Sequence, residues 1–204
     1  MIIGITGGSG SGKTAFIREL RNRFGEDQLA IISEDNYYRP RQEQMADENG
    51  VLNFDIPEAI EDSALISDIL KLKNGQAIIR TEYTFNNDRL SPREIKPPAA
   101  PVIIVEGLFI LHRQEIRSLI NLSVLIHARD ELKLIRRIHR DQQERNYPLD
   151  DVLYRYQHHV SPAYQKYIAP YLDEIDLTIN NNKHFVNGVD LLASYILHCG
   201  LKKN

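Results

Sequence analysis

The sequence predicts an α/β fold in which helices cover both faces of a five-stranded parallel sheet. Short β-branched runs alternate with segments of helical periodicity, and a glycine-rich loop joins the first such run to the first helix. Strands that alternate with helices form parallel sheets with right-handed crossovers. A chain of 204 residues with 42% hydrophobic content is sufficient for one packed core. We therefore expect a single domain over residues 1–204.

Five segments are expected to be strands. The clearest is the run at residues 102–105, because an almost continuous stretch of β-branched residues is typical of a strand covered on both faces. Together the predicted strands occupy residues 2–5, 29–33, 102–105, 122–126 and 175–179.

Helices are expected between these strands and after the last one. The apolar spacing predicts them over residues 15–24, in a segment opened by residues 53–57 and closed by Asn74-Gly75, and over residues 130–145, 147–171 and 186–197. We expect a break near Ser161-Pro162, since proline disrupts a helix interior. A small β lobe is expected at about residues 76–100, and a helical lid that bears arginines at about residues 130–147.

The chain is organised around the glycine-rich loop. The loop consists of Gly7, Gly8, Ser9, Gly10, Ser11, Gly12, Lys13 and Thr14, which fits the P-loop pattern of Gly, four free positions, Gly, Lys and Ser or Thr. Glycines let successive backbone N–H groups approach phosphate oxygens. Lys13 is expected to contact the outer phosphates of ATP, and Thr14 to complete the shell of a Mg²⁺ ion. A flexible Gly/Ser turn is the alternative, but the order of strand, loop and helix favours a P-loop NTPase fold.

Two acidic residues follow predicted strands, at the edge of the sheet where ligands collect in open α/β folds. Asp35 comes after the second strand, where a carboxylate can accept the proton of an attacking hydroxyl. Its alternative role is an Asx-turn or a helix cap. Glu106 follows the strand at 102–105 and can hold Mg²⁺ directly or through water, with an ordinary strand-end charge as the alternative.

Two further clusters have open interpretations. The arginines at 136, 137, 140 and 145 form either a solvated helix face or a cluster that closes on the transferred phosphate. His158 and His159 are adjacent in the chain, and adjacent residues on a helix point in different directions, so a shared metal ion is not favoured.

The composition narrows the classes of partner. A formal net charge of -3 gives no general attraction to nucleic acid or to an anionic membrane. No apolar run approaches the length of a membrane span and no signal-type segment opens the sequence, so we expect a cytoplasmic protein. Cys199 is the only cysteine, which excludes an intrachain disulfide and a cysteine-based zinc site, and its apolar surroundings predict a buried thiol.

Several segments beyond the P-loop form an ordered series over nearly the whole chain. They are Ser33-Glu34-Asp35-Asn36-Tyr37-Tyr38, Asn53-Phe54-Asp55-Ile56-Pro57, Tyr83-Thr84-Phe85, Val105-Glu106-Gly107 and the arginine-bearing segment from Arg136 to Arg145. In this order they resemble the uridine kinase (uridine-cytidine kinase) family of P-loop kinases. The resemblance implies a family fold, ATP and Mg²⁺ as cofactors, a small nucleoside as substrate, and a homo-oligomer, since the family is typically tetrameric.

The resemblance also implies roles for single residues. Asp35 resembles the catalytic base of the family and acts beside Lys13, Tyr38 lies on the substrate side, and Asp55 contacts the ribose hydroxyls. The aromatic pair that lines the base pocket is Tyr83 and Phe85; Arg137 touches the sugar, while Arg140 and Arg145 meet phosphates.

The chain departs from the family pattern at three positions that concern the nucleoside. Asp88 stands where the family commonly has a histidine that faces the base, Tyr147 replaces a lid arginine, and Arg155 aligns with a glutamine. We expect Asp88 and Arg155 to bind the substrate together, and the identity of the base stays open.

The sequence thus predicts an ATP-dependent kinase that phosphorylates the 5′-hydroxyl of uridine or cytidine. The nearest alternative is a related kinase for another nucleoside, pantothenate or a sugar phosphate, and Asn53-Phe54-Asp55 favours the nucleoside. A GTPase-type switch needs an Asn-Lys-x-Asp segment, and the nearest stretch, Asn182-Lys183-His184-Phe185, lacks the Asp. A nucleotide-binding regulator without catalysis is the third class, which a search for ADP formation would separate.

Overall fold

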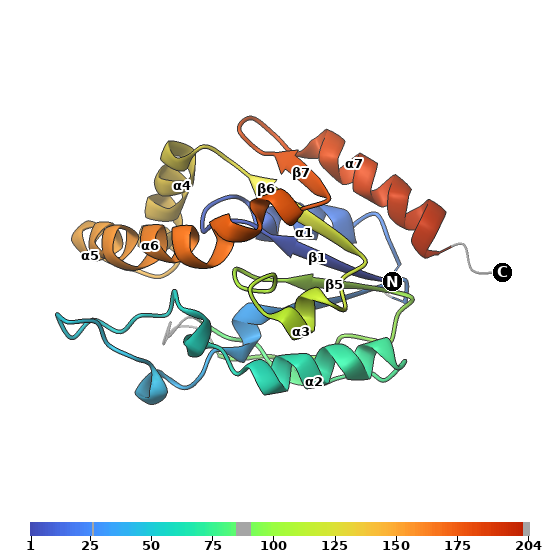
Figure 1. Cartoon of the computed structure of the whole chain (residues 1–204), viewed down its shortest axis with the longest axis horizontal. Helices are drawn as coiled ribbons and strands as arrows, with labels where there is room; N and C mark the ends of the chain where they lie inside the picture. Colours follow the sequence, from blue (N-terminus) through green and yellow to red (C-terminus); the bar gives the residue numbers. More distant parts are fainter. Residues whose placement is uncertain (26, 85–90, 202–204) are drawn as a thin grey trace.

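A parallel sheet lies at the centre of the computed structural model, which describes residues 1–25, 27–84 and 91–201. Its strands are ordered β2-β5-β1-β6-β7 (Figure 1). Their bounds are Ile2–Thr6 for β1, Leu29–Ser33 for β2, Val102–Glu106 for β5, Leu122–His127 for β6 and Leu177–Asn180 for β7. Every pair is parallel, and Ile3 of β1 lies opposite Ile104 of β5 and Leu122 of β6. The five predicted strands are confirmed, although β7 begins two residues later than predicted.

Helices cover both faces of the sheet. They are α1 (Lys13–Arg21), α2 (Asp62–Lys73), α3 (Gln114–Arg117), α4 (Asp130–Gln143), α5 (Leu149–Arg155), α6 (Ser161–Ala163) and α7 (Val186–Tyr195). Short 3-10 turns lie at Glu34–Tyr37, Arg41–Glu43, Pro57–Ala59 and Ala169–Glu174, and π-helical turns at Tyr156–Val160, Tyr164–Ile168 and Ile196–Gly200. Helices α1 and α7 pack on one face, while α2 and α3 pack on the other (Figure 1).

The side chains of β5 divide the core into two layers. Val102 and Ile104 belong to the layer under α1 and α7, whereas Ile103 and Val105 belong to the layer under α2 and α3. Successive side chains of a strand point to opposite faces, so a strand between two layers must be apolar throughout. The unbroken apolar run in the sequence is therefore explained by burial on both faces.

The expected helix break at Ser161-Pro162 is wrong. The helical path continues through α6, and Val160 before it keeps helical angles, with φ -67° and ψ -48°. Proline removes one N–H donor from a helix. Here π-helical turns lie on both sides of Pro162, and their wider hydrogen-bond spacing accommodates the missing donor without a turn in the chain. Cys199 also differs from expectation, because its side chain is exposed.

Within the expected β lobe, β3 (Arg80–Thr81) pairs antiparallel with β4 (Glu94–Ile95). Phe85 and Asp88, which the sequence assigns to the substrate, lie outside the described residues. In the three ranges that the structure describes, no helix combines the length and the apolar character needed to cross a bilayer.

Candidate active site

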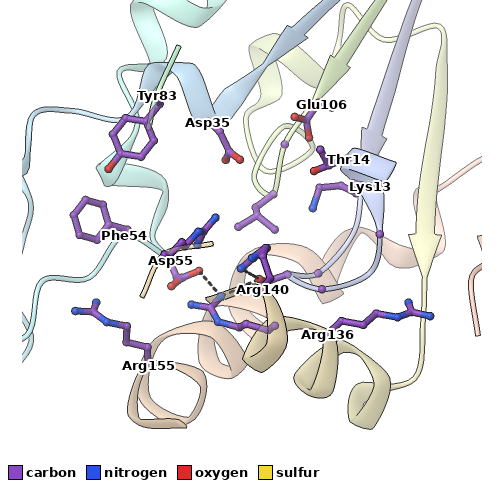
Figure 2. Close-up of a pocket in the computed structure, with 18 of the residues that line it drawn as sticks. Lys13, Thr14, Asp35, Phe54, Asp55, Tyr83, Glu106, Arg136, Arg140 and Arg155 are labelled. Atoms are coloured by element: carbon purple, nitrogen blue, oxygen red, sulfur yellow. Dashed lines mark hydrogen bonds and ion pairs between the residues drawn. The ribbon is translucent and has the colours of Figure 1, made fainter. Parts of the chain in front are cut away.

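A cavity of about 290 Å³ opens at the carboxyl ends of the central strands. The P-loop, the ends of β2 and β5, the segment after residue 53, and helices α4 and α5 form its walls (Figure 2). Its lining includes most of the predicted site residues: Gly8, Ser9, Gly10, Gly12, Lys13, Thr14, Asp35, Tyr38, Asp55, Tyr83, Glu106, Arg137, Arg140, Arg145 and Arg155. Gly7 and Ser11 belong to the loop but do not line the cavity. Six further residues line the cavity: Ala15 and Leu108, to which the sequence assigned no part in the site, and Phe54, Gly107, Arg136 and Tyr147, which it named without assigning a ligand contact.

The P-loop backbone needs glycine for steric reasons, most clearly at Gly10 and Gly12. Gly10 and Gly12 have φ values of 80° and 98°, in the left-handed region that L side chains rarely adopt. A Cβ at Gly10 would lie 2.2 Å from the carbonyl oxygen of Lys133, and one at Gly12 would lie 2.3 Å from Nδ2 of Asn181. The loop is therefore pressed against α4 and the segment after β7, which fixes the shape of the cradle.

Lys13 occupies the first turn of α1, next to the glycines. Its Nζ donates to the carbonyl oxygen of Gly7 at 2.7 Å. Burial lowers the pKa of the Lys13 ammonium, while the carboxylates of Glu106 and Asp35 oppose that effect. Figure 2 shows Lys13, Thr14 and Glu106 together on one side of the cavity, with Asp35 facing them. One cation and two carboxylates thus meet where a phosphate chain and a metal ion would lie.

Asp35 and Glu106 are held at the ends of neighbouring strands. Ser33, the last residue of β2, lies opposite Glu106 and donates from Oγ to Oε1 of Glu106 at 2.5 Å. The same Ser33 oxygen accepts from the Asp35 N–H at 3.3 Å, so Ser33 is the cap of the following 3-10 turn and Asp35 is not. The helix-cap alternative for Asp35 is therefore wrong, and its carboxylate is directed into the cavity (Figure 2).

Burial shifts the titration of both carboxyl groups. It raises the pKa of Glu106 to about 7, and the nearby charge of Asp35 adds to the rise. Burial also raises the pKa of Asp35, although the charges of Lys13, Arg145 and Arg140 oppose it. Two buried carboxyl groups that repel each other form a place where a cation is stabilising.

The residues near the P-loop fit a magnesium ion by their donor chemistry. The Thr14 hydroxyl and the Glu106 carboxylate are oxygen donors, which Mg²⁺ prefers, and Mg²⁺ is usually bound through one or two carboxylates together with phosphates. The described residues contain no group of three or more His, Cys, Asp or Glu side chains that could hold a metal ion. A Mg²⁺ site of this kind needs only one or two carboxylates, because phosphates and water supply the other ligands.

Asp141 organises the arginines of α4, and the sequence interpretation missed it. This carboxylate is 1% exposed and contacts three guanidinium groups. Its oxygens lie 3.2 Å from Nε of Arg137, 2.9 Å from Nη2 of Arg140 and 3.2 Å from Nη1 of Arg145. These arginines are therefore not a solvated face. The sequence did contain a signal for this role. Arg137 lies four residues before Asp141 and Arg145 lies four residues after it, and residues four apart are neighbours on a helix.

Two of these arginines also contact the P-loop. Nη1 of Arg137 donates to Oγ of Ser9 at 2.8 Å, and Nη2 of Arg140 donates to the same oxygen at 3.5 Å. Arg136 points elsewhere, since its Nη2 donates to the Asn181 carbonyl at 2.9 Å (Figure 2). Arg137 and Arg140 of the lid are thus hydrogen-bonded to the loop whose phosphate-binding backbone they face.

Aromatic rings and one carboxylate form the opposite end of the cavity. The Tyr38 ring packs against Phe54 and Tyr83, with centroids 5.9 and 5.0 Å away. Oδ1 of Asp55 lies 4.0 Å from Nη1 of Arg137, so this end meets the arginine lid. Flat apolar surfaces beside a carboxylate suit a ligand with a ring and hydroxyl groups.

Residues 2–185 match the Phosphoribulokinase / Uridine kinase family. The chain belongs to this family. It is 36% identical over 183 residues to the uridine kinase of Chlamydia pneumoniae, a match that covers 89% of this chain and 82% of that protein. It is 32% identical over 203 residues to the uridine kinase of Brevibacillus brevis, covering 100% of this chain and 95% of that protein.

Family membership agrees with the shared fold. The phosphoribulokinase from Rhodobacter spheroides superposes with a TM-score of 0.61 at 21% identity, over 88% of this chain and 69% of that chain. The expected P-loop NTPase fold and the resemblance to the uridine kinase family are confirmed.

Proposed function

We propose that the protein is an ATP-dependent uridine kinase, which transfers the γ-phosphoryl group of ATP to the 5′-hydroxyl of uridine or cytidine. The observation that carries the proposal is the layout of one cavity. Asp35 faces Lys13 of the P-loop at one end, and aromatic rings with Asp55 form the other end (Figure 2). The names of the relatives support the same reaction.

The P-loop and the lid arginines bind the phosphates. Backbone N–H groups of the loop and the Lys13 ammonium face the β- and γ-phosphates, and Arg140 and Arg145 neutralise charge from the lid. Thr14 and Glu106 are the residues that would hold Mg²⁺, which supplies further charge neutralisation on the phosphates. Positioning and charge stabilisation account for most catalysis of phosphoryl transfer.

Asp35 acts as the general base. Its carboxylate takes the proton of the nucleoside 5′-hydroxyl while that oxygen forms a bond to the γ-phosphorus, and the bond from phosphorus to the β-phosphate oxygen breaks to release ADP. The raised pKa of Asp35 makes it a stronger base than an exposed aspartate once it is ionised.

The nucleoside binds at the aromatic end. Tyr38, Phe54 and Tyr83 provide surfaces for the base, while Asp55 and Arg137 are placed to contact the ribose hydroxyls. The resemblance assigns Phe85 to the base, and Asp88 stands at a position where the family has a base-facing histidine; both residues lie outside the described ranges. A homo-oligomer, a tetramer by that resemblance, acting in the cytoplasm in pyrimidine salvage, completes the proposed function.

A substrate panel tests the proposal. Purified protein is mixed with ATP, Mg²⁺ and one acceptor at a time: uridine, cytidine, adenosine, guanosine, pantothenate or a sugar phosphate. We expect ADP with uridine or cytidine and a nucleoside 5′-monophosphate as the second product. ADP formed only with another acceptor would overturn the substrate, and no ADP with any acceptor would overturn catalysis.

A further inference from the structure

A small hairpin at residues 45–53 stands directly before the substrate segment that contains Phe54 and Asp55. Ala46 and Leu52 form its antiparallel bridge, and the Asn53 N–H donates to the Met45 carbonyl at 2.8 Å. All residues from 40 to 56 are described, and Gln44 is the only buried one among them. The hairpin therefore has no apolar anchor of its own, so polar contacts must hold it in place.

Asp47 provides these contacts with both carboxylate oxygens. Oδ1 accepts from the N–H groups of Asn49 and Val51, each at 2.9 Å, which fixes the turn of the hairpin. Oδ2 accepts from the Tyr154 hydroxyl at 2.8 Å and lies 2.7 Å from Nε2 of His159. One oxygen thus shapes the hairpin, and the other attaches it to the helical segment more than a hundred residues later.

His159 is buried at this junction, with 2% of its surface exposed. The π-helical turn Tyr156–Val160 carries it, and such turns occur frequently at functional sites. His158 points elsewhere and stacks on the Tyr154 ring, with centroids 4.4 Å apart. The adjacent histidines of the sequence therefore have separate roles: one orients Tyr154 and the other binds Asp47.

The junction leads directly to the cavity. Nη1 of Arg155 donates to the Leu52 carbonyl at 2.8 Å, and Arg155, Phe54 and Asp55 all line the cavity. Figure 2 shows Arg155 below Phe54 and Asp55 on the same side of the cavity. Figure 1 shows the loop that contains the hairpin below α5 in this view. Phe54 and Asp55 thus form one wall of the cavity and Arg155 forms another, and the distance between these walls depends on how the hairpin is attached to α5.

We propose that Asp47, Tyr154 and His159 form a clasp that positions the nucleoside wall of the cavity. The three are positioning residues, since none of them lines the cavity. The clasp holds the hairpin against the helical segment, which sets the place of Phe54 and Asp55 relative to Arg155. This inference rests on the proposed function for the identity of the ligand.

Kinetics of clasp variants test the proposal. Tyr154→Phe removes one hydroxyl and keeps the ring, and a double variant adds His159→Phe. We expect the KM for uridine to rise about tenfold in the double variant, with the KM for ATP changed less than about twofold, because only the nucleoside wall loses contacts and the Arg155 bond to Leu52 is the one that remains. His159→Gln keeps an N–H that can donate to Asp47 and should stay near the wild-type KM.

Tyr171→Phe is the matched control. The Tyr171 hydroxyl lies 3.1 Å from Nδ1 of His112, and neither residue lines the cavity. The substitution therefore removes the hydroxyl of a second Tyr–His pair away from the nucleoside. It should leave both KM values unchanged. An unchanged uridine KM in the double variant, or an equal rise in the uridine and ATP KM values, would overturn the clasp as a positioning device.

Hydrogen exchange separates the clasp from the proposed function. In the protein without ligands, we expect faster exchange at the amides of residues 45–53 in the double variant, with exchange in β5 unchanged. If the wild type phosphorylates no nucleoside, the proposed function is wrong and the exchange result alone judges the clasp. Retained protection of residues 45–53 in the double variant would then overturn it.

Discussion

Glu34 and Arg113 form a buried ion pair directly behind the cavity, with Nη1 of Arg113 2.9 Å from Oε1 of Glu34. The two side chains are 2% and 5% exposed. Arg113 also donates to Asp62 and to the Pro57 carbonyl, while the second Glu34 oxygen accepts from the Phe109 N–H. The pair therefore joins the residue before Asp35 to α2, to the substrate segment and to the loop after β5.

Removal of this guanidinium should destabilise the protein. In Arg113→Met the Glu34 carboxylate loses its cation inside the core, and breaking a buried pair in this way costs about 3–5 kcal/mol. Urea denaturation measures the loss. Arg117→Met is the control, because Arg117 is the last residue of α3, close to Arg113 in the chain, but pairs with an exposed Glu174 at 3.8 Å. Arg117→Met should lower the free energy of unfolding by about 1 kcal/mol or less. Equal losses in the two variants would contradict a special role for Arg113.

The Glu34–Arg113 pair also shows where the sequence was insufficient. The two residues are 79 positions apart, and neither belongs to a pattern with a fixed spacing. Asp35 and Glu106, by contrast, were predictable, because each follows a β-branched run and the carboxyl ends of parallel strands share one edge. Local chemistry located the site, whereas the contacts that hold it depend on how distant segments pack.

The same distinction holds for the helices. The strands and the P-loop were predicted because periodicity and glycine spacing are local signals. The path through Pro162 was not, since it depends on π-helical turns that accommodate the missing donor. Tyr154 and His159 were not assigned either, because their partner Asp47 comes from a polar connection with no apolar pattern.

Asp35→Asn should abolish most turnover. The amide keeps the shape of the side chain but cannot take a proton, and general bases contribute typically about 10² to 10⁴-fold. We expect kcat to fall within that range while the KM for uridine changes far less. Steady-state kinetics with varied uridine measures both. A loss confined to KM would make Asp35 a binding residue instead.

The pH dependence of activity should follow Asp35. Burial raises its pKa above the usual value for aspartate, and only the ionised form accepts a proton. Activity should therefore fall as the pH decreases through this raised pKa, and the acid limb of kcat/KM for the free enzyme reports Asp35 together with Glu106, whose pKa is raised to about 7. The charge of Asp55 contributes to the rise, so Asp55→Asn should move the midpoint to lower pH. A midpoint that stays fixed, or moves to higher pH, would contradict this assignment.

Asp141→Asn should reduce turnover more than it weakens ATP binding. The variant loses the carboxylate that orients three arginines, while the extra net positive charge still attracts the phosphates. Because transition-state stabilisation depends on fixed geometry, we expect kcat to fall about 10 to 100-fold, with a smaller change in the KM for ATP. Asp130→Asn is the control on the same helix, since that exposed carboxylate pairs with Lys133. Equal kcat values in the two variants would show that Asp141 does not organise the lid.

Arg155 should favour uridine over cytidine. Its Nε is buried without a hydrogen-bond partner among the described residues, and the side chain lines the nucleoside end of the cavity. A guanidinium only donates hydrogen bonds, so it can bind the carbonyl by which uracil differs from cytosine, and it opposes the cytosine amine. A hydrogen bond to a charged group contributes about 1.5–3 kcal/mol, which corresponds to roughly tenfold or more in kcat/KM.

The ratio of the two nucleosides tests this, because a change in the hairpin would affect both alike. Arg155 also holds the Leu52 carbonyl, so Arg155→Met should lower kcat/KM for both nucleosides, but more for uridine, by roughly tenfold. Asp88→Ala and the double variant complete the cycle. If Asp88 engages Arg155 as a unit, the two single changes will not add in the double variant. An unchanged uridine-to-cytidine ratio in Arg155→Met would show that the guanidinium supports the hairpin and does not recognise the base.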